Sequence, residues 1–211
     1  MKNKITIIDY GVGNLLSISK AIEKCGFECL ITSNIQLIAD ATHLILPGVG
    51  AFKYAMKELK KRKLDTALKL AVKKNAKVLG ICLGMQLFFE NSEEFGSTEG
   101  LGFIKRNVIP VPDKDLSGKN QKIPIIGWYE MNIVRDNNAD LLIFNSKKSN
   151  FVYFVHSFMA KLKDKNNIIA HYNYGGYEIP AIIKKNNIYG CQFHPEKSGN
   201  IGIEILKKFC A

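Results

Sequence analysis

The sequence predicts an α/β protein: an open, mostly parallel sheet flanked by helices, with an antiparallel elaboration in its second half. The first half alternates short apolar runs with amphipathic runs, a pattern typical of βαβ units and a parallel sheet. After Gly100, short β-like runs follow one another with turn residues between them, which is typical of antiparallel strands. The 211 residues suit one domain, residues 1–211, with ample material for a core.

The first half supplies the parallel strands and the helices that connect them. Leu15, Ile18 and Ile22 recur at the spacing of one helical face. The run 77–81 is short and apolar, as expected of a strand buried on both sides of a parallel sheet. The expected strands are 5–9, 28–32, 43–46 and 77–81, and the expected helices are 15–24, 51–59, 64–73 and 83–90.

The second half supplies shorter strands and one closing helix. Residues 112–121 are rich in charge, glycine and asparagine, so we expect an exposed loop there. The run 199–210 is expected to form the last helix. The expected strands are 102–111, 123–128, 131–135, 150–158, 168–174, 180–185 and 188–193.

The net charge of +11 comes almost entirely from lysine, since the only arginines are Arg62, Arg106 and Arg135. Arginine is the residue preferred for bidentate recognition of phosphates and bases. No aromatic-basic signature of an RNA-binding module is present. We therefore expect no nucleic-acid partner, and a solvated lysine-rich surface or a face for an acidic partner.

Further features of the sequence exclude other classes. No apolar run approaches about 18 residues, so we expect no membrane span, and an acidic residue at Asp9 comes too early for a signal peptide. The five cysteines include no CxxC pair, so no metal or disulfide framework is expected. The turn around Gly11 and Gly13 has Leu16 in place of the third glycine of a dinucleotide fingerprint. We expect a cytoplasmic protein without metal or cofactor.

The most informative segment is Gly80-Ile81-Cys82-Leu83-Gly84, which has the form of a nucleophile elbow. Small residues on both sides let the Cys82 side chain stand exposed between a strand and a helix. The N-terminal dipole of that helix would favour thiolate over thiol. Alone, the motif also fits a buried structural cysteine, because cysteine often packs as a small hydrophobe.

A second segment, His194-Pro195-Glu196, supplies an imidazole and a carboxylate two residues apart. On an extended chain such neighbours can lie on one face, so the carboxylate can orient and charge-stabilise the histidine. Cys82, His194 and Glu196 together predict a catalytic triad, and therefore an enzyme.

The segment Pro47-Gly48-Val49-Gly50 forms a glycine-flanked turn after the strand 43–46. Its backbone N–H groups can point into the cleft beside Cys82, where acyl transfer needs donors for the developing oxyanion. The alternative is a plain turn without a role in catalysis.

These motifs, with Gly127-Trp128, Tyr153-Phe154-Val155-His156-Ser157 and the run 192–198, resemble the triad-type (class I) glutamine amidotransferases. Within them the chain is most similar to the glutaminase subunit of imidazole glycerol phosphate synthase. The opening Asp9-Tyr10-Gly11-Val12-Gly13-Asn14-Leu15 and the Pro-Gly-Val-Gly turn favour that branch. The resemblance covers residues 5–209 and implies a single glutamine amidotransferase domain.

The resemblance implies a role for each matching residue. Cys82 would be the nucleophile, His194 the acid-base and Glu196 its orienter. The amides of Leu83 and, after a local peptide flip, Val49 would form the oxyanion hole. The implied glutamine-binding residues are Gly50, Gln86, Glu94, Ser157 and Phe158, the last two mainly through backbone. The face toward a (β/α)₈-barrel cyclase partner would contain Asn14 and Trp128.

The implied activity is hydrolysis of glutamine to glutamate and ammonia. The ammonia would pass to the cyclase, which makes imidazole glycerol phosphate and the aminoimidazole carboxamide ribotide of histidine biosynthesis. No cofactor or metal is implied.

Two departures from the family pattern keep alternatives open. Tyr129 stands where asparagine is expected after Gly-Trp, and Phe158 stands where tyrosine is expected. Tyr129 leaves room for a paralogous glutaminase that feeds ammonia to another synthase, such as one of an amidino-sugar pathway. A non-enzymatic interaction module with a redox-sensing cysteine is the alternative of another class, and the intact His194–Glu196 pair argues against it.

Overall fold

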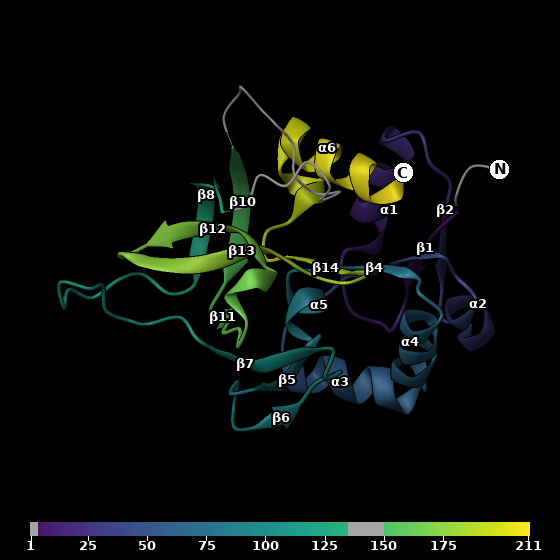
Figure 1. Ribbon diagram of the computed structural model, residues 1–211, viewed down its shortest axis with the longest axis horizontal. Helices are drawn as coiled ribbons and strands as arrows, with labels where there is room; N and C mark the ends of the chain where they lie inside the picture. The colour runs from purple at the N-terminus through teal and green to yellow at the C-terminus, as the bar shows by residue number, and fades with distance from the viewer. Residues whose placement is uncertain (1–3, 135–149) are drawn as a thin grey trace.

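The computed structural model describes residues 4–134 and 150–211, and its centre is an eight-stranded sheet (Figure 1). The strand order is β2-β1-β3-β4-β14-β13-β12-β9. Neighbours from β2 to β14 are parallel, and the remaining pairs are antiparallel. The strands are β1 (Ile5–Ile8), β2 (Cys29–Thr32), β3 (His43–Leu46), β4 (Lys77–Ile81), β9 (Asn132–Ile133), β12 (Ile168–Tyr174), β13 (Tyr177–Lys185) and β14 (Ile188–Cys191).

Helices cover both faces of the parallel part of the sheet (Figure 1). On one face, α1 (Leu15–Lys24) and α6 (Gly199–Cys210) pack over Ile5 and Ile7 of β1. On the other face, Ile8 packs with side chains of the remaining helices. Apart from the edge strand β2, whose Ile31 is 39% exposed, the parallel strands are buried on both faces of the sheet and are mostly apolar. The helices of the second face are α2 (Ile35–Ala39), α3 (Phe52–Lys61) and α4 (Leu64–Lys73).

Two smaller sheets complete the fold. One has four strands in the order β11-β7-β5-β6, and the other is the antiparallel pair β8 and β10. In that pair Tyr153 lies opposite Trp128, and we call the pair the β8–β10 ribbon. The strands are β5 (Phe89–Ser92), β6 (Thr98–Glu99), β7 (Ile104–Pro110), β8 (Ile125–Glu130), β10 (Phe151–His156) and β11 (Phe158–Ala160).

The predicted fold class is confirmed, and several elements have the predicted bounds. The helices 15–24, 64–73 and 199–210 and the strands 43–46 and 77–81 begin and end where the sequence places them. The loop 112–121 contains one isolated bridge, between Lys114 and Asn120. Of the strand expected at 131–135, residues 132–133 form β9, and Arg135 lies outside the described residues.

The helix predicted at 83–90 is wrong beyond Gln86. Helix α5 (Leu83–Gln86) is a single turn, and β5 begins at Phe89. Phe88 and Phe89 are fully buried, and their carbonyls accept from the amides of Ile104 and Gly102. Because this segment is buried on all sides, its apolar run lacks the periodicity that separates a helix from a strand. The helix dipole expected behind Cys82 is correspondingly limited to one turn.

Helix α2 was not predicted from the sequence. Its N-cap is Asn34, whose side-chain oxygen accepts from the amides of Gln36 and Leu37. This is a standard N-cap arrangement. The helix is only five residues long, too short for an apolar repeat to be visible in the sequence.

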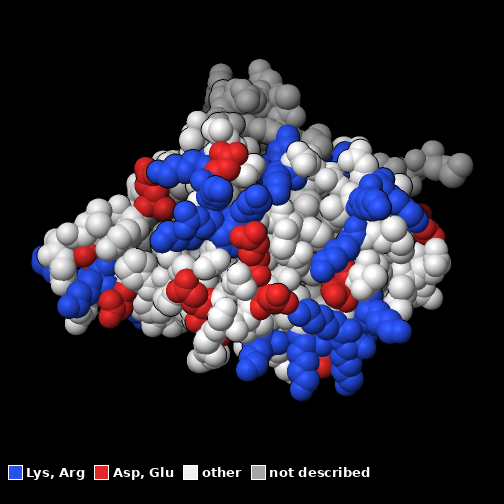
Figure 2. Space-filling model, turned by 60° about the horizontal axis from the view of Figure 1, so that its bottom comes forward, with Lys and Arg blue, Asp and Glu red and all other residues white. Residues whose placement is uncertain are grey.

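Lysine and arginine side chains cluster on the face shown in Figure 2, with acidic side chains between them. Four lysines, Lys53, Lys57, Lys60 and Lys61, line an open pocket beside α3. Lys60 pairs with Glu99 across it at 3.6 Å. Within the described ranges, no helix is long and apolar enough to cross a membrane.

Candidate active site

Cys82 lies at the sharp turn between β4 and α5, where its backbone has φ 54° and ψ −111°. A positive φ is uncommon for a residue other than glycine and persists only where the surroundings hold it. The glycines on either side are required by space. A Cβ at Gly80 would lie 2.6 Å from the amide nitrogen of Met85, and one at Gly84 would overlap the carbonyl oxygen of Leu46.

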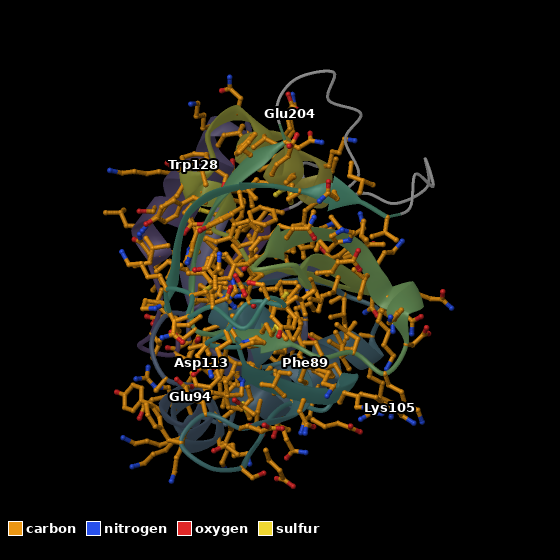
Figure 3. The ribbon with its side chains drawn as sticks, turned by 90° about the vertical axis from the view of Figure 1, so that its left-hand side faces the viewer. Phe89, Glu94, Lys105, Asp113, Trp128 and Glu204 are labelled. Carbon is orange, nitrogen blue, oxygen red and sulfur yellow. The ribbon has the colours of Figure 1, made fainter. Side chains whose placement is uncertain are left out.

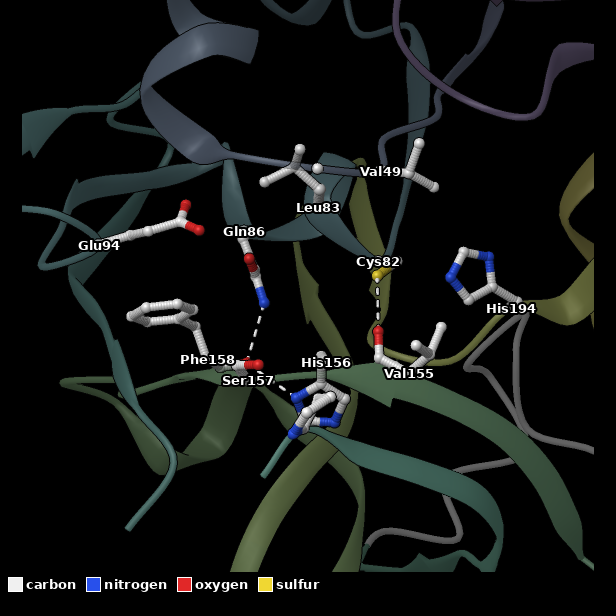
Figure 4. A pocket seen from close by; sticks show the side chains of 12 residues that line it. Val49, Cys82, Leu83, Gln86, Glu94, Val155, His156, Ser157, Phe158 and His194 are labelled. Carbon is white, nitrogen blue, oxygen red and sulfur yellow. Dashed lines mark hydrogen bonds between the residues drawn. The ribbon is translucent and has the colours of Figure 1, made fainter. Parts of the chain in front are cut away.

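A pocket of about 360 Å³ opens at the carboxyl ends of β3 and β4, beside Cys82 (Figure 4). Open parallel sheets collect their sites at this edge. Every predicted catalytic, oxyanion and glutamine-binding residue lines this pocket except Glu196, which lies behind His194. The predicted residues that line it are Val49, Gly50, Cys82, Leu83, Gln86, Glu94, Ser157, Phe158 and His194.

The predicted histidine and carboxylate are hydrogen-bonded to each other. His194 Nδ1 lies 2.8 Å from Glu196 Oε1, and both side chains are buried. Figure 4 shows the His194 ring beside Cys82, on the side of the pocket opposite Glu94. The other ring nitrogen, Nε2, makes no well-formed hydrogen bond to any residue that the structure describes, so it is available to the Cys82 sulfur or to a substrate.

The electrostatics of His194 result from opposing effects. Burial alone lowers the pKa of His194, but the neighbouring Cys82 and Glu196 raise it, and the net shift is upward. A histidine whose protonated form is favoured by a thiolate on one side and a carboxylate on the other can take and return a proton during catalysis.

None of the other four cysteines, Cys25, Cys29, Cys191 and Cys210, lines this pocket. Burial raises the pKa of Cys25, Cys29 and Cys191, and raises that of Cys210 to about 12. All five cysteines are free thiols. A raised pKa reduces the fraction of thiolate, which is the nucleophilic form of cysteine. Cys25, Cys29, Cys191 and Cys210 are therefore poor candidates for covalent chemistry.

The Pro47–Gly50 turn forms a second wall of the pocket. Val49 is 43% exposed, and Gly50 has φ +89° with no atom within 4 Å of the position that a Cβ would occupy. The start of the turn is held more firmly, since the buried Tyr10 hydroxyl donates to the Pro47 carbonyl at 2.7 Å. The Leu83 amide belongs to the first turn of α5, where no carbonyl of the helix can accept it.

Polar side chains surround the far end of the pocket. Gln86 Nε2 donates to the Phe158 carbonyl at 3.0 Å and to Gln192 Oε1 at 3.1 Å. Glu94 Oε2 accepts from the Phe52 amide at the start of α3, at 2.6 Å. The Gln86 amide and the Glu94 carboxylate therefore offer oxygen acceptors at one end of the pocket, while Cys82 lies at the other (Figure 4).

His156 lines the pocket near Gln86 and Phe158 and is held by two hydrogen bonds. Its Nδ1 lies 2.8 Å from the Phe158 carbonyl, which can only accept, so Nδ1 carries the proton. Its Nε2 then accepts from the Tyr172 hydroxyl at 2.7 Å. Burial and, to a smaller extent, the nearby His194 lower the pKa of His156, and the bond to the Phe158 carbonyl opposes them; the net pKa is about 4. His156 is therefore a neutral hydrogen-bonding group.

The two residues predicted to face a partner lie outside this pocket. Trp128 is 52% exposed on the β8–β10 ribbon, and Asn14 is the residue that precedes α1. Figure 3 shows Trp128 at the edge of the molecule, toward the top of the view, with Glu94 toward the bottom. Neither residue lines the pocket, and among the described residues neither forms a hydrogen bond to a predicted catalytic side chain, so their expected role is separate from catalysis.

Sequence reasoning missed Tyr10, His156 and Gln192 as members of the site. Each is buried and hydrogen-bonded to a residue of the predicted site or to the turn beside it. The motifs at residues 9–15, 153–157 and 192–198 contain all three. A polar residue inside an apolar run was the available signal, because a buried polar group needs a partner.

Comparisons with known proteins agree with the predicted family and fold. The family model described as "Glutamine amidotransferase class-I" matches residues 6–211. The imidazole glycerol phosphate synthase subunit HisH of Caldanaerobacter subterraneus subsp. tengcongensis is 45% identical, over 97% of this chain and 96% of its own length. The protein of the same name from Lactococcus lactis is 44% identical, over 98% and 97%.

Solved structures show the same fold at lower sequence identity. PurLQS from Thermotoga maritima includes a chain with a TM-score of 0.72 and 23% identity, matching 99% of this chain and 96% of that one. The glutaminase domain of Trypanosoma brucei CTPS with bound acivicin has a TM-score of 0.65 and 17% identity, over 98% and 91%.

Proposed function

The chain belongs to the class-I glutamine amidotransferase family, and we propose that this enzyme is the glutaminase subunit of an imidazole glycerol phosphate synthase. Relatives of that name match nearly the whole chain at 41–45% identity. The match from residue 6 to residue 211 supports our treatment of residues 1–211 as one amidotransferase domain.

The observation that carries the proposal is the pocket shared by Cys82 and His194, with Glu196 bonded behind the histidine. In the proposed reaction the Cys82 thiolate attacks the side-chain amide carbon of glutamine. His194 protonates the departing ammonia and then activates water, which hydrolyses the thioester to glutamate. Glu196 keeps Nδ1 protonated, so that Nε2 faces the reacting atoms.

The oxyanion hole would be formed by the amides of Leu83 and Val49. The Leu83 amide adjoins the nucleophile, as in other nucleophile elbows. The Val49 amide, which belongs to the Gly48–Val49 peptide, would join it after a local peptide flip. The flip rotates ψ of Gly48 and φ of Val49, and it is eased because Gly48 has no Cβ and because Val49 is 43% exposed. Such donors act where charge develops in the transition state.

Glutamine recognition would use the acceptors at the far end of the pocket. Both amide hydrogens of Gln86 are already donated, so only its Oε1 remains for a substrate. That oxygen and the Glu94 carboxylate suit the α-ammonium group of an amino acid. Backbone groups of Gly50, Ser157 and Phe158 line the same space and would hold the remaining substrate atoms.

The β8–β10 ribbon supports a partner surface beside the pocket. Ile126 and Trp128 are each 52% exposed, and Phe151 is 44% exposed. Exposed aromatic and aliphatic side chains grouped on one face are typical of protein interfaces. We propose that this face, with Asn14, binds a (β/α)₈-barrel cyclase. The cyclase would use the ammonia to form imidazole glycerol phosphate and the aminoimidazole carboxamide ribotide.

The proposed enzyme works in the cytoplasm, where a reducing environment would keep Cys82 as a thiol. Glutamine is the only small-molecule substrate proposed for this subunit, and the chemistry requires no cofactor.

A paralogous glutaminase with another acceptor is the second candidate, because Tyr129 departs from the family pattern at the position after Gly127-Trp128. The Tyr129 ring packs within 6.1 Å of Phe154, 5.5 Å of Tyr172 and 5.7 Å of Tyr174, measured between ring centroids. It is thus directed toward the core rather than toward the face that carries Trp128. This position gives no support for a different partner. A redox-sensing module is disfavoured by the bonded His194–Glu196 pair.

The test is co-purification of the tagged full chain from its own cells, followed by mass spectrometry of the bound partner and a glutaminase assay of the complex. Recovery of a barrel cyclase, with glutamate release that Cys82→Ala abolishes, is expected. Recovery of a sugar-pathway synthase instead would favour the paralogue, and a complex without glutaminase activity would overturn both.

A further inference from the structure

Gln192 is a buried polar residue that the triad chemistry does not use. It follows β14, which runs parallel to β4 with Cys191 opposite Ile81, so Gln192 and Cys82 lie at neighbouring strand ends. The Cys82 amide donates to the Cys191 carbonyl at 2.7 Å, and the Gln192 side chain has no exposed surface. Gln192 Nε2 lies 3.8 Å from Cys82 Sγ.

The orientation of the Gln192 amide follows from its hydrogen-bond partners. The Phe158 carbonyl can only accept, so the Gln86 group that meets it must be the NH₂ group. The second hydrogen of that NH₂ group is directed to Gln192, which must therefore present its oxygen. The Gln192 NH₂ group is left facing Cys82 Sγ. The Phe158 carbonyl thus fixes the orientation of Gln86, and Gln86 fixes that of Gln192, so that an N–H donor faces the Cys82 sulfur.

A donor at this position distinguishes the two protonation states of Cys82. As a thiol, Cys82 can donate to the Val155 carbonyl, 3.8 Å from the sulfur. As a thiolate it loses that bond and can only accept. Hydrogen bonds to a charged acceptor are about twice as strong as neutral ones, so the Gln192 N–H favours the thiolate.

We propose that Gln192 stabilises the Cys82 thiolate by direct N–H donation, with its orientation fixed by Gln86 and the Phe158 carbonyl. The inference rests on the proposed function in so far as Cys82 is the nucleophile of glutamine hydrolysis. It adds a residue outside the triad to the groups that prepare the nucleophile.

The test is the pH profile of Cys82 alkylation by iodoacetamide in the full chain, followed by peptide mass spectrometry. Gln192→Met keeps a similar volume and removes the donor. We expect the midpoint of the profile to rise by about one pH unit, the scale of one hydrogen bond to a charged group. In the complex with its partner, kcat near neutral pH should fall about tenfold, recover as pH rises, and leave KM changed less.

Two variants keep the outcome clear. Gln192→Glu retains an acceptor for Gln86 but places oxygen atoms toward the sulfur, so it should fold and shift the midpoint at least as far upward. Gln121→Met is the matched control, because Gln121 donates to the Pro112 carbonyl in the loop 112–121. It should leave the profile unchanged.

An unchanged alkylation midpoint in folded Gln192→Met or Gln192→Glu would overturn the proposal. Alkylation requires no glutamine, so the two proposals fail separately. A shifted midpoint without glutaminase activity in the wild-type complex would leave Gln192 in its role and reject the proposed function. Normal glutaminase activity of the wild-type complex with an unshifted alkylation midpoint in the Gln192 variants would support the proposed function and reject the role of Gln192.

Discussion

Two neighbouring turns at the ends of β3 and β4 line one pocket, and the tips of these turns differ in how tightly they are packed. At the Cys82 turn, a Cβ on Gly80 or Gly84 would collide with backbone atoms. At the Pro47–Gly50 turn, a Cβ on Gly50 would meet nothing within 4 Å. Gly80 and Gly84 are required by close approach, as is Gly48 at the start of the second turn, where a Cβ would lie 2.7 Å from the Gly84 amide nitrogen. Gly50, at the end of that turn, is required for conformational freedom.

The difference separates the two parts of the proposed chemistry. The proposed nucleophile, Cys82, is held in a closely packed turn without any ligand, because Gly80 and Gly84 on either side of it lie directly against neighbouring backbone atoms. The proposed oxyanion donor at Val49 is adjustable, because this exposed residue is flanked by Gly48 and Gly50, which tolerate backbone angles that other residues resist. A partner that selects one peptide orientation could therefore control the rate without moving Cys82.

The largest expected effect is loss of the nucleophile on the packed wall. Cys82→Ala and Cys82→Ser should each reduce kcat for glutamine hydrolysis by about 10⁶, the scale found when a triad nucleophile is removed. Glutamate release by the complex and circular dichroism of each variant are the measurements. Cys29→Ser, at a partly exposed thiol, is the control and should retain full activity.

Alkylation gives an independent reading of the same claim. Cys82 should react well before the other four cysteines, whose pKa values are raised by burial. Peptide mapping that finds Cys25 or Cys29 labelled first, with activity lost in step, would remove Cys82 from the role.

The next effect concerns the pair behind Cys82. His194→Asn should cost about as much as loss of the nucleophile, because the triad acts as a unit. Glu196→Gln should cost about two orders of magnitude less, since its Oε1 can still accept from His194 Nδ1. Steady-state kinetics of both variants in the complex provide the test. Equal or greater damage from Glu196→Gln would mean that the two roles are misassigned.

A matched pair of alanine variants tests the packing difference itself. Gly84→Ala should destabilise the fold by about 3 kcal/mol or more, because its Cβ must displace the Leu46 backbone. Gly50→Ala should cost about 1 kcal/mol, from its positive φ alone. Urea unfolding of both variants measures the two costs. Similar losses of stability in Gly84→Ala and Gly50→Ala would contradict the distinction between a closely packed Cys82 turn and an adjustable Pro47–Gly50 turn.

The smallest effect is a pH dependence of stability from His156. Its pKa in the folded chain is about 4, below the ordinary value of 6.5. Between these values the unfolded state binds a proton that the folded state does not, so stability falls as pH falls. Going from pH 6.5 to pH 5 should cost about 2 kcal/mol from this residue. Urea unfolding at both values should show a smaller loss in His156→Asn.

The exposed Leu116, whose side chain does not titrate, provides the control for that measurement. Leu116→Asn should leave the pH dependence of wild type unchanged. An equal slope in wild type and His156→Asn would mean that His156 is not held neutral in the folded chain.

The sequence predicted the fold class and the parallel half of the sheet well. Helices such as 64–73 are amphipathic, so their apolar residues recur with a clear helical period, and strands such as 77–81 are short apolar runs of strand length. The prediction failed at residues 87–90, where an apolar run is buried by tertiary pairing. It also missed α2, which depends on a cap rather than on a repeat.

The site was predicted unevenly for a related reason. Cys82, His194 and Glu196 stand in short motifs whose chemistry is readable from residue type and spacing. Gln192 and His156 act through contacts with residues distant in sequence, such as Gln86 and Tyr172. The roles of such groups emerge only when the strands that carry them are brought side by side.

The central claim is that the oxyanion donor is absent until a partner biases the Pro47–Gly50 turn. Steady-state glutaminase kinetics of the chain alone, with the barrel cyclase, and with cyclase plus its acceptor nucleotide test it directly. Activation should appear mainly in kcat, by about 10²–10³, the cost of one missing oxyanion donor, with KM changing less. A lone chain that already turns over at the full rate of the complex would contradict the claim and identify an autonomous glutaminase.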